Sequence, residues 1–209
     1  MLIVFTRFPT PGQTKTRLIP TLGEAGAAEL QRMLSDYTFR TCCDLANKRP
    51  LAIEVHYEGG NRADVKKWIP AVMQGKPQCQ GSLGERLIHA FTRGFNAGME
   101  RVIIIGADCP FVTPEIFSQG YALLLDNDLV IGPANDGGCY LIGLSKPLYF
   151  LWQNIDWGTD KVLCQIIEIS KNHGVTLSCL QPLSDIDRPE DLHNLYDPRS
   201  GFCLFWSRK

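Results

Sequence analysis

Aspartates stand where a metal-dependent reaction would need them. Asp108 follows the apolar run 102–105 after Gly106 and Ala107, and Asp185 and Asp187 alternate along one extended segment. Mg²⁺ in proteins is usually held by one or two carboxylates together with substrate phosphates. We therefore predict Asp108 as a catalytic residue and metal ligand, with Asp185 and Asp187 as further ligands pointing to one side. The alternative for Asp187 is that it caps the following helix, with Glu190 completing a capping box.

A second group of residues suits the binding of phosphate. The loop after the first apolar run contains Pro11 and Gly12, and Lys15 and Arg17 follow close to the start of a helix. Such a loop lets backbone N–H groups face an anion while the two cations add charge. It lacks the second glycine and the Gly-Lys-Ser/Thr step of a Walker A loop. The alternative is an ordinary solvated loop with two surface cations.

Two further segments could contact a substrate. Asp136 precedes Gly137 and Gly138, and glycines permit close approach of the backbone to a ligand. Asp-Gly is also a strong hairpin signal, and for this segment alone a plain hairpin is the favoured interpretation. Trp157 and Thr159 place an aromatic surface beside a helix start, although a packed tryptophan is the commoner reason for such a pair.

Strands alternating with helices must position these residues. Strands are expected at 2–6, 51–57, 102–105, 129–131, 140–144 and 175–180. A first helix is expected at about 24–46, and a second begins at a capping box at Ser82. A third is expected from a Thr113 cap to about 126, a fourth from Thr159 or Asp160 to 172, and a last one at 187–196. This order favours a single-domain α/β fold over residues 1–209, with a mostly parallel sheet and helices on both faces. Ligands of such sheets bind beyond the carboxyl ends of the strands, where the polar clusters fall.

Composition narrows the class of partner. Lys and Arg number 21 against 22 for Asp and Glu, so no basic field for nucleic acid exists. No apolar stretch approaches the roughly 18–20 residues of a membrane span, and no signal peptide precedes the first strand. The eight cysteines show no zinc-like spacing, which indicates reduced, mostly buried thiols in a cytoplasmic protein. The apolar tail 202–206 is expected to pack on the body or at a contact between subunits of a homo-oligomer.

Six short motifs occur in order along the chain. They are Lys15-Thr-Arg17-Leu18, Leu83-Gly-Glu85-Arg86, Gly106-Ala-Asp108-Cys-Pro110, Gly132-Pro-Ala-x-Asp136-Gly-Gly138, Trp157-Gly-Thr159 and Asp185-Ile-Asp187-x-Pro-Glu-Asp191-Leu. Together they resemble the DUF2064 family of glycosyltransferase-like proteins, which has the GT-A, or nucleotide-diphospho-sugar transferase, fold. The resemblance implies that Lys15, Arg17 and Arg86 bind nucleotide phosphates, and that the three aspartates hold Mg²⁺ or Mn²⁺. It also implies that the loop 136–138 faces the acceptor or the transferred group.

The reaction stays open between alternatives. The family favours glycosyl transfer from a nucleotide sugar to a small-molecule acceptor, with Asp136 as a candidate base. Guanylyltransferases share the fold, so nucleotidyl transfer to a phosphorylated acceptor is the second hypothesis, although their acceptor motif is not obvious here. A non-catalytic nucleotide-binding protein is the third, because Cys139 and Ser82 stand where the family usually has tyrosine and an acidic residue. The three retained aspartates weigh against that third hypothesis.

Overall fold

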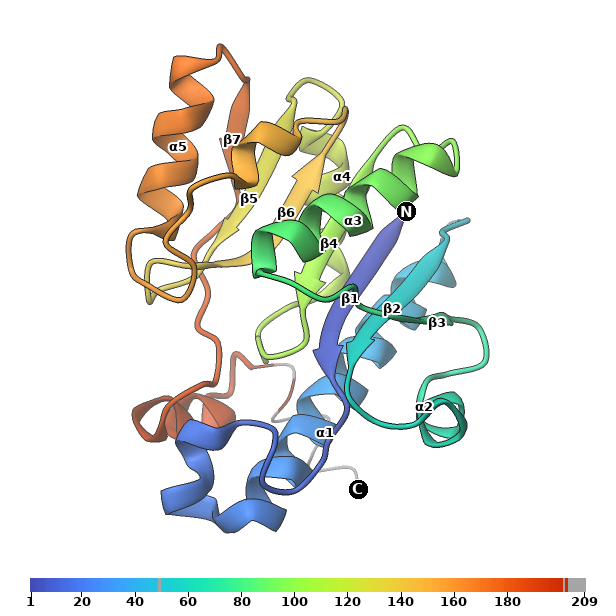
Figure 1. Ribbon diagram of the computed structural model, residues 1–209, viewed down its shortest axis with the longest axis vertical. Helices are drawn as coiled ribbons and strands as arrows, with labels where there is room; N and C mark the ends of the chain where they lie inside the picture. The colour runs from blue at the N-terminus through green and yellow to red at the C-terminus, as the bar shows by residue number, and fades with distance from the viewer. Residues whose placement is uncertain (49, 201, 203–209) are drawn as a thin grey trace.

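The computed structural model describes residues 1–48, 50–200 and 202, which form one domain around a seven-stranded sheet (Figure 1). The strands are β1 (Leu2–Arg7), β2 (Ile53–Glu58), β3 (Gln74–Pro77), β4 (Val102–Gly106), β5 (Leu129–Pro133), β6 (Cys139–Leu144) and β7 (Leu177–Cys179). The α-helices are α1 (Ile19–Ala46), α2 (Arg62–Trp68), α3 (Leu83–Asn96), α4 (Pro114–Leu123) and α5 (Val162–Asn172). Short 3-10 helices are η1 (Thr16–Leu18), η2 (Tyr149–Trp152) and η3 (Pro189–Tyr196).

The sheet is mostly parallel, as the sequence predicts. Its order is β3-β2-β1-β4-β6-β5-β7, and among the described strands only β6 runs against its neighbours. The chain adds β2 and β3 on one side of β1 and then returns to place β4 on the other side. The carboxyl ends of β1 and β4 therefore flank the point where the strand order reverses, which is where α/β sheets bind their ligands.

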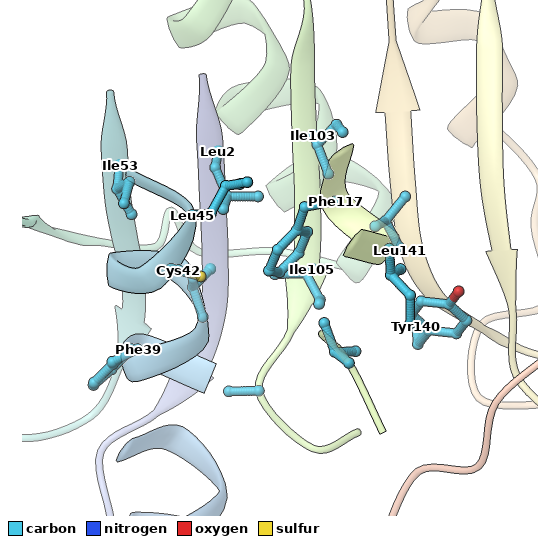
Figure 2. Close-up of a cluster of buried hydrophobic side chains, with 14 of the residues drawn as sticks. Leu2, Phe39, Cys42, Leu45, Ile53, Ile103, Ile105, Phe117, Tyr140 and Leu141 are labelled. Atoms are coloured by element: carbon cyan, nitrogen blue, oxygen red, sulfur yellow. The ribbon is translucent and has the colours of Figure 1, made fainter. Parts of the chain in front are cut away.

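Both faces of the sheet are covered by helices. Alternate residues of β4 point to opposite faces, so Ile103 and Ile105 join one core cluster and Val102 and Ile104 join the other. Figure 2 shows the first cluster, in which side chains of α1, including Phe39 and Leu45, lie over the strands. Helices α2 and α4 also contribute to this cluster, while α3, η2 and α5 cover the opposite face. The β4 strand is thus buried on both faces, as its unbroken apolar run predicts.

Two helix starts follow directly from local sequence. The predicted capping box of α3 is present, with the Ser82 hydroxyl accepting from the Glu85 N–H and the Glu85 carboxylate accepting from the Ser82 N–H. In α1 the predicted start at Glu24 marks the straight part of the helix. One earlier turn joins it through Gly23, whose φ of 70° and ψ of 167° break the helix there.

The structure corrects several predicted boundaries. The short helix α2 and the edge strand β3 were not predicted from the sequence. Helix α5 begins at Val162 with Lys161 as its N-cap, so neither Thr159 nor Asp160 is the cap. Thr113 occupies the N-cap position of α4 but makes no side-chain capping hydrogen bond. The last helix is a 3-10 helix, and its N-cap is Arg188.

The cysteines among the described residues are free, but they are not mostly buried. Of the described cysteines only Cys42 and Cys109 are buried, whereas Cys164 and Cys179 are exposed. No helix within the described ranges is both long and apolar enough to cross a membrane.

A small third cluster joins η1 and α1 to the C-terminal segment of the chain. The segment after β7 runs down to η3, beside η1 and the start of α1 (Figure 1). There Ile186 and Phe202 pack against Leu18 and Tyr37, and both Ile186 and Phe202 are buried. Phe202 therefore packs on the body of the protein, while residues 203–206 of the expected apolar tail lie outside the described residues.

Candidate functional site

A cleft of about 580 Å³ opens at the carboxyl ends of β1, β2, β4 and β5. Ten of the predicted site residues line it, namely Lys15, Arg17, Arg86, Asp108, Asp136, Gly138, Trp157, Thr159, Asp185 and Asp187. They come from segments far apart in the sequence. Pro11, Gly12 and Gly137, which were also predicted to contact ligand, do not line the cleft.

The acidic side of the cleft is formed by β4 and the segment before η3. Asp108 follows β4, and Gly106 leaves room for it, because a Cβ atom at Gly106 would lie 2.7 Å from the Asp108 carboxylate. The Ile186 N–H donates to the Asp108 carbonyl at 3.0 Å, and the Ile186 side chain is fully buried. Asp185 and Asp187 both line the cleft on either side of this anchor, as alternation predicts.

Asp187 does not cap the last helix. The carboxylate of Asp191 takes that role, accepting from the N–H groups of Asp187 at 3.0 Å and Arg188 at 2.7 Å. The alternative interpretation of Asp187 as a helix cap is therefore wrong. Its side chain instead pairs with Arg17 and lies 3.8 Å from the Lys15 ammonium.

The protonation of one aspartate is perturbed by its surroundings. Burial and the nearby carboxylates of Asp108 and Asp136 raise the pKa of Asp185 to about 7. Carboxylate oxygens are hard donors of the kind that Mg²⁺ or Mn²⁺ prefers, and one or two of them together with substrate phosphates are the usual Mg²⁺ ligands. Within the described residues, however, no three His, Cys, Asp or Glu side chains are gathered closely enough to hold a metal ion.

Lys15 is held inside this acidic part of the cleft. Its ammonium donates to the Ile186 carbonyl at 2.5 Å and lies 3.5 Å from the Asp108 carboxylate. Its side chain is only 5% exposed, whereas that of Arg17 is 56% exposed. The alternative of two solvated surface cations therefore holds for Arg17 at most.

At the opposite end of the cleft, the predicted residue Arg86 contacts side chains that the sequence interpretation missed. The Arg86 guanidinium donates to Glu58 at 2.9 Å, to Gln78 at 3.3 Å and to the Gly81 carbonyl at 3.0 Å. Arg7 also pairs with Glu58, at 3.0 Å. The hydrogen bond from Arg86 and the charge of Arg7 lower the pKa of Glu58, although burial acts the other way. Glu58 is therefore ionised at neutral pH and fixes the position of Arg86.

A signal for Glu58 was present in the sequence. It ends β2 as an acidic residue and is followed by Gly59 and Gly60, much as Asp108 follows β4. A second missed residue, Gln31, is a buried polar side chain within the apolar stripe of α1. It lines the cleft and donates to Thr6 at 3.2 Å.

The loop 136–138 is a hairpin between β5 and β6. The Gly138 N–H donates to the Asp136 carboxylate at 2.8 Å, and the Ala134 N–H donates to the Gly138 carbonyl at 2.9 Å. Asp136 and Gly138 line the cleft, but Gly137 packs against Asp160, where a Cβ atom would lie 2.3 Å from the Asp160 carbonyl oxygen. The hairpin interpretation is therefore correct, and the hairpin also brings Asp136 to the site.

Trp157 and Thr159 lie in the turn that precedes α5, and both line the cleft. The indole nitrogen of Trp157 packs on α3, 3.0 Å from where a Cβ atom on Gly84 would lie. The Thr159 hydroxyl donates to the Asp156 carbonyl at 2.7 Å, which stabilises the turn. Cys139 also lines the cleft, and burial raises the pKa of its thiol to about 12. The thiol is therefore protonated at neutral pH and is a poor nucleophile.

Comparison with known proteins places this chain in a family. The chain belongs to the DUF2064 family, described as uncharacterised proteins conserved in bacteria, whose model matches residues 41–159. No protein with a curated description matches the chain in sequence.

Solved structures share the whole fold. A candidate nucleotide-diphospho-sugar transferase from Desulfovibrio desulfuricans G20 is 26% identical, with a TM-score of 0.86 over 99% of this chain and 94% of that one. A CMP:2-keto-3-deoxy-manno-octonic acid synthetase in complex with CTP is 8% identical, with a TM-score of 0.60 over 100% and 99%. Rv0371c from Mycobacterium tuberculosis H37Rv, in complex with manganese, is 14% identical, with a TM-score of 0.52 over 94% and 98%. The fold is that of nucleotide-diphospho-sugar transferases and cytidylyltransferases, and the chain is transferase-like.

Proposed function

We propose that this protein is a metal-dependent transferase that uses a nucleotide-activated donor, with glycosyl transfer from a nucleotide sugar as its reaction. The observation that carries the proposal is the position of Asp108, Asp185 and Asp136 in one cleft with Lys15 and Arg17. The negative charge of a diphosphate must be balanced by cations. A divalent cation between the phosphate and the protein is usually held by carboxylates. Both are present at the edge of the sheet where the fold binds ligands.

Each group of residues in the cleft has a distinct task in this reaction. Lys15 and Arg17 bind the diphosphate of the donor, and Asp108 and Asp185 would hold Mg²⁺ or Mn²⁺, with Asp187 as a candidate further ligand. A divalent ion bound there would supply charge neutralisation of the leaving diphosphate. Asp136 takes the proton of the acceptor hydroxyl while the oxygen of that hydroxyl attacks the anomeric carbon of the sugar. The bond from the anomeric carbon to the diphosphate breaks, and the nucleoside diphosphate leaves. Trp157 offers an aromatic surface to the sugar.

Nucleotidyl transfer is the second candidate. It is favoured by the full-length likeness to a synthetase that was solved with CTP. In that reaction a phosphorylated acceptor attacks the α-phosphorus of a nucleoside triphosphate and pyrophosphate leaves. The same cations and carboxylates would serve, so the donor distinguishes the two reactions.

A thermal-shift screen followed by turnover assays tests the proposal. Nucleoside triphosphates and nucleotide sugars are each added with and without Mn²⁺, and a ligand at about 100 times its Kd adds about 2.7 kcal/mol of stability. We expect a metal-dependent shift with a nucleotide sugar, followed by release of the nucleoside diphosphate when acceptors are supplied. A shift with a triphosphate alone, and release of pyrophosphate, would favour nucleotidyl transfer. Shifts in melting temperature that are the same with and without Mn²⁺ would favour the non-catalytic alternative.

The matched pair Asp108→Asn and Asp126→Asn localises the effect. Asp126 is exposed and precedes β5 at the opposite edge of the sheet. Charge stabilisation by a bound metal amounts to several kcal/mol, so Asp108→Asn should lower turnover at least about 100-fold. Asp126→Asn should leave turnover unchanged, and an equal loss in both variants would remove Asp108 from the site.

A further inference from the structure

Lys15 is a buried cation among the predicted metal ligands. Its ammonium lies 3.5 Å from an Asp108 oxygen and 3.8 Å from an Asp187 oxygen, and its side chain is 5% exposed. A lysine ammonium has three protons to donate and accepts none. One proton goes to the Ile186 carbonyl at 2.5 Å, which leaves two for the carboxylates. Lys15 is therefore a counter-ion of Asp108 and shares Asp187 with Arg17 in this conformation.

The backbone fixes the positions of both Lys15 and the Ile186 carbonyl that accepts from it. Lys15 has a left-handed conformation, with φ 48° and ψ 44°, which non-glycine residues adopt infrequently. Its carbonyl accepts from the Leu18 N–H at 2.8 Å, so the loop closes directly into η1. The Ile186 carbonyl that receives the ammonium belongs to a fully buried residue bonded to Asp108. The position of the ammonium is thus built into the fold, unlike that of a solvated surface lysine.

We propose that Lys15 and a divalent metal ion compete for the same carboxylates, so that the metal ion alone binds weakly until a phosphate draws the ammonium away. This inference rests on the proposed function for the metal and the nucleotide. Carboxylate oxygens lie about 2.0–2.1 Å from a bound Mg²⁺. An ammonium that stays at its present distance from Asp108 would therefore lie within a few ångströms of the metal ion. Burial leaves that repulsion weakly screened by salt.

Phosphate oxygens of a nucleotide offer the ammonium a new partner. When Lys15 moves to the phosphate, it frees carboxylate oxygens for the metal ion, and the metal ion in turn attracts the phosphate. Nucleotide and metal ion therefore strengthen each other's binding, and this coupling is reciprocal. The competition therefore favours binding of the metal ion together with the nucleotide donor over binding of the metal ion alone.

The binding of Mn²⁺ alone, with no nucleotide present, tests this competition. Free Mn²⁺ is measured by electron paramagnetic resonance in titrations of the wild type, Lys15→Gln and Lys15→Arg. Glutamine keeps a donor for the Ile186 carbonyl and removes the charge, whereas arginine keeps the charge. We expect Lys15→Gln to bind Mn²⁺ at least about tenfold more tightly than wild type, within the usual range of coupling between sites. Lys15→Arg should remain weak.

The control is Lys146→Gln, which makes the same charge change outside the cleft. Lys146 pairs with Asp128 at 2.7 Å, and its side chain is 53% exposed. Its Mn²⁺ affinity should equal that of wild type. Asp108→Asn added to Lys15→Gln should abolish the gain. Equal or weaker Mn²⁺ binding by Lys15→Gln, or no binding by either protein, would overturn the competition.

A measurement on the wild-type protein covers the case in which a Lys15 variant does not fold. Amine-reactive labelling of Lys15, followed by mass spectrometry, should accelerate when saturating Mn²⁺ displaces the ammonium from the carboxylates. Unchanged labelling at saturating Mn²⁺ would contradict the inference. Neither experiment uses a nucleotide or turnover. The proposed transfer reaction is judged separately, by whether wild type releases a nucleoside diphosphate from a nucleotide sugar.

Discussion

Glu58 and Arg86 illustrate how a single side chain changes the interpretation of another. The sequence motif assigns Arg86 to phosphate, yet three protein groups already accept from its guanidinium. Glu58 accepts from both Arg86 and Arg7 through the same carboxylate oxygen. We therefore interpret Arg86 as a cation that organises the polar end of the cleft around Glu58 and Gln78, with at most part of its charge available to a ligand.

The aspartates were predictable from the sequence because strand ends and alternation determine where they lie. Asp108 follows an unambiguous buried strand, and Asp185 and Asp187 flank an isoleucine that packs inward. The burial of Lys15 was not predictable, since it depends on the Ile186 carbonyl, 171 residues away in sequence. Gln31 was missed because a polar residue on a helix has no periodic signature of its own, whereas Glu58 was overlooked although it ends a strand before two glycines.

His56 makes the stability of the protein depend on pH. It lies on β2, 2% exposed, and its Nε2 is 2.8 Å from the Glu54 carboxylate. Burial lowers the pKa of His56 below the ordinary histidine value of 6.5, in spite of the attraction of Glu54. As pH falls through about 6.5, the unfolded chain takes up a proton that the folded chain does not. The free energy of unfolding should therefore fall, by at most about 1.4 kcal/mol per pH unit.

Urea denaturation of wild type and His56→Gln between pH 7.5 and 5.5 checks this expectation. Glutamine cannot titrate but can still donate to Glu54, so the variant should lose most of the slope. His193→Gln, at an exposed position, serves as the control and should keep it. The contribution of Glu54, whose pKa is lowered by Arg93 and His56 against the effect of burial, should appear only below about pH 4.5. Identical slopes in wild type and His56→Gln would refute the assignment.

At the scale of elements, the β5–β6 hairpin and the start of α5 act as one unit. The Leu163 N–H donates to the Gly137 carbonyl at 3.0 Å, and Gly137 has a φ of 89°. Gly137→Ala would place a Cβ atom 2.3 Å from the Asp160 carbonyl oxygen, in addition to the strain of positive φ. We expect a loss of about 2–3 kcal/mol in unfolding free energy, together with weaker nucleotide-sugar binding, since Asp136 would move.

The matched control for this change is Gly174→Ala. Gly174 has a φ of 64° but no heavy atom within 4 Å of an added Cβ, so only backbone strain of about 1 kcal/mol is expected. Chemical denaturation of both variants measures the difference. Equal destabilisation would show that the contact with Asp160 costs nothing.

The elements themselves were predictable where hydrophobic periodicity was strong. The apolar stripe along α1, from Ala27 to Leu45, is buried throughout. The run of isoleucines in β4 likewise predicted a buried strand correctly. The β3 strand was missed because it is an edge strand whose residues are mostly exposed. Helix α2 was missed because only seven residues form it, too few for a period to be recognised. Helix α5 begins later than expected because the preceding turn folds onto Gly137 rather than into the helix.

At the scale of the whole molecule, the cleft depends on the packing of the C-terminal segment against η1 and α1. Asp185 and Asp187 belong to no strand of the sheet. They reach Lys15 because Ile186, Leu18 and Phe202 share one small core beside α1 (Figure 1). No pattern in the sequence predicts this meeting, since it joins segments that are almost the full length of the chain apart. The aspartates on this segment are therefore positioned by packing rather than by backbone pairing in the sheet.

Phe202→Ala tests this dependence. Phe202 is 2% exposed and packs edge-on against Tyr37 at 5.9 Å between ring centroids. Truncation of a buried phenylalanine costs about 3–5 kcal/mol, and here the loss falls on the core that holds Ile186. We expect lower stability and, in protein that is still folded, weaker Mn²⁺-dependent binding of the nucleotide sugar. Leu125→Ala, at a side chain 69% exposed, should change neither by more than about 0.5 kcal/mol. Destabilisation by Phe202→Ala with unchanged ligand affinity would mean that the last segment stabilises the fold without positioning the aspartates.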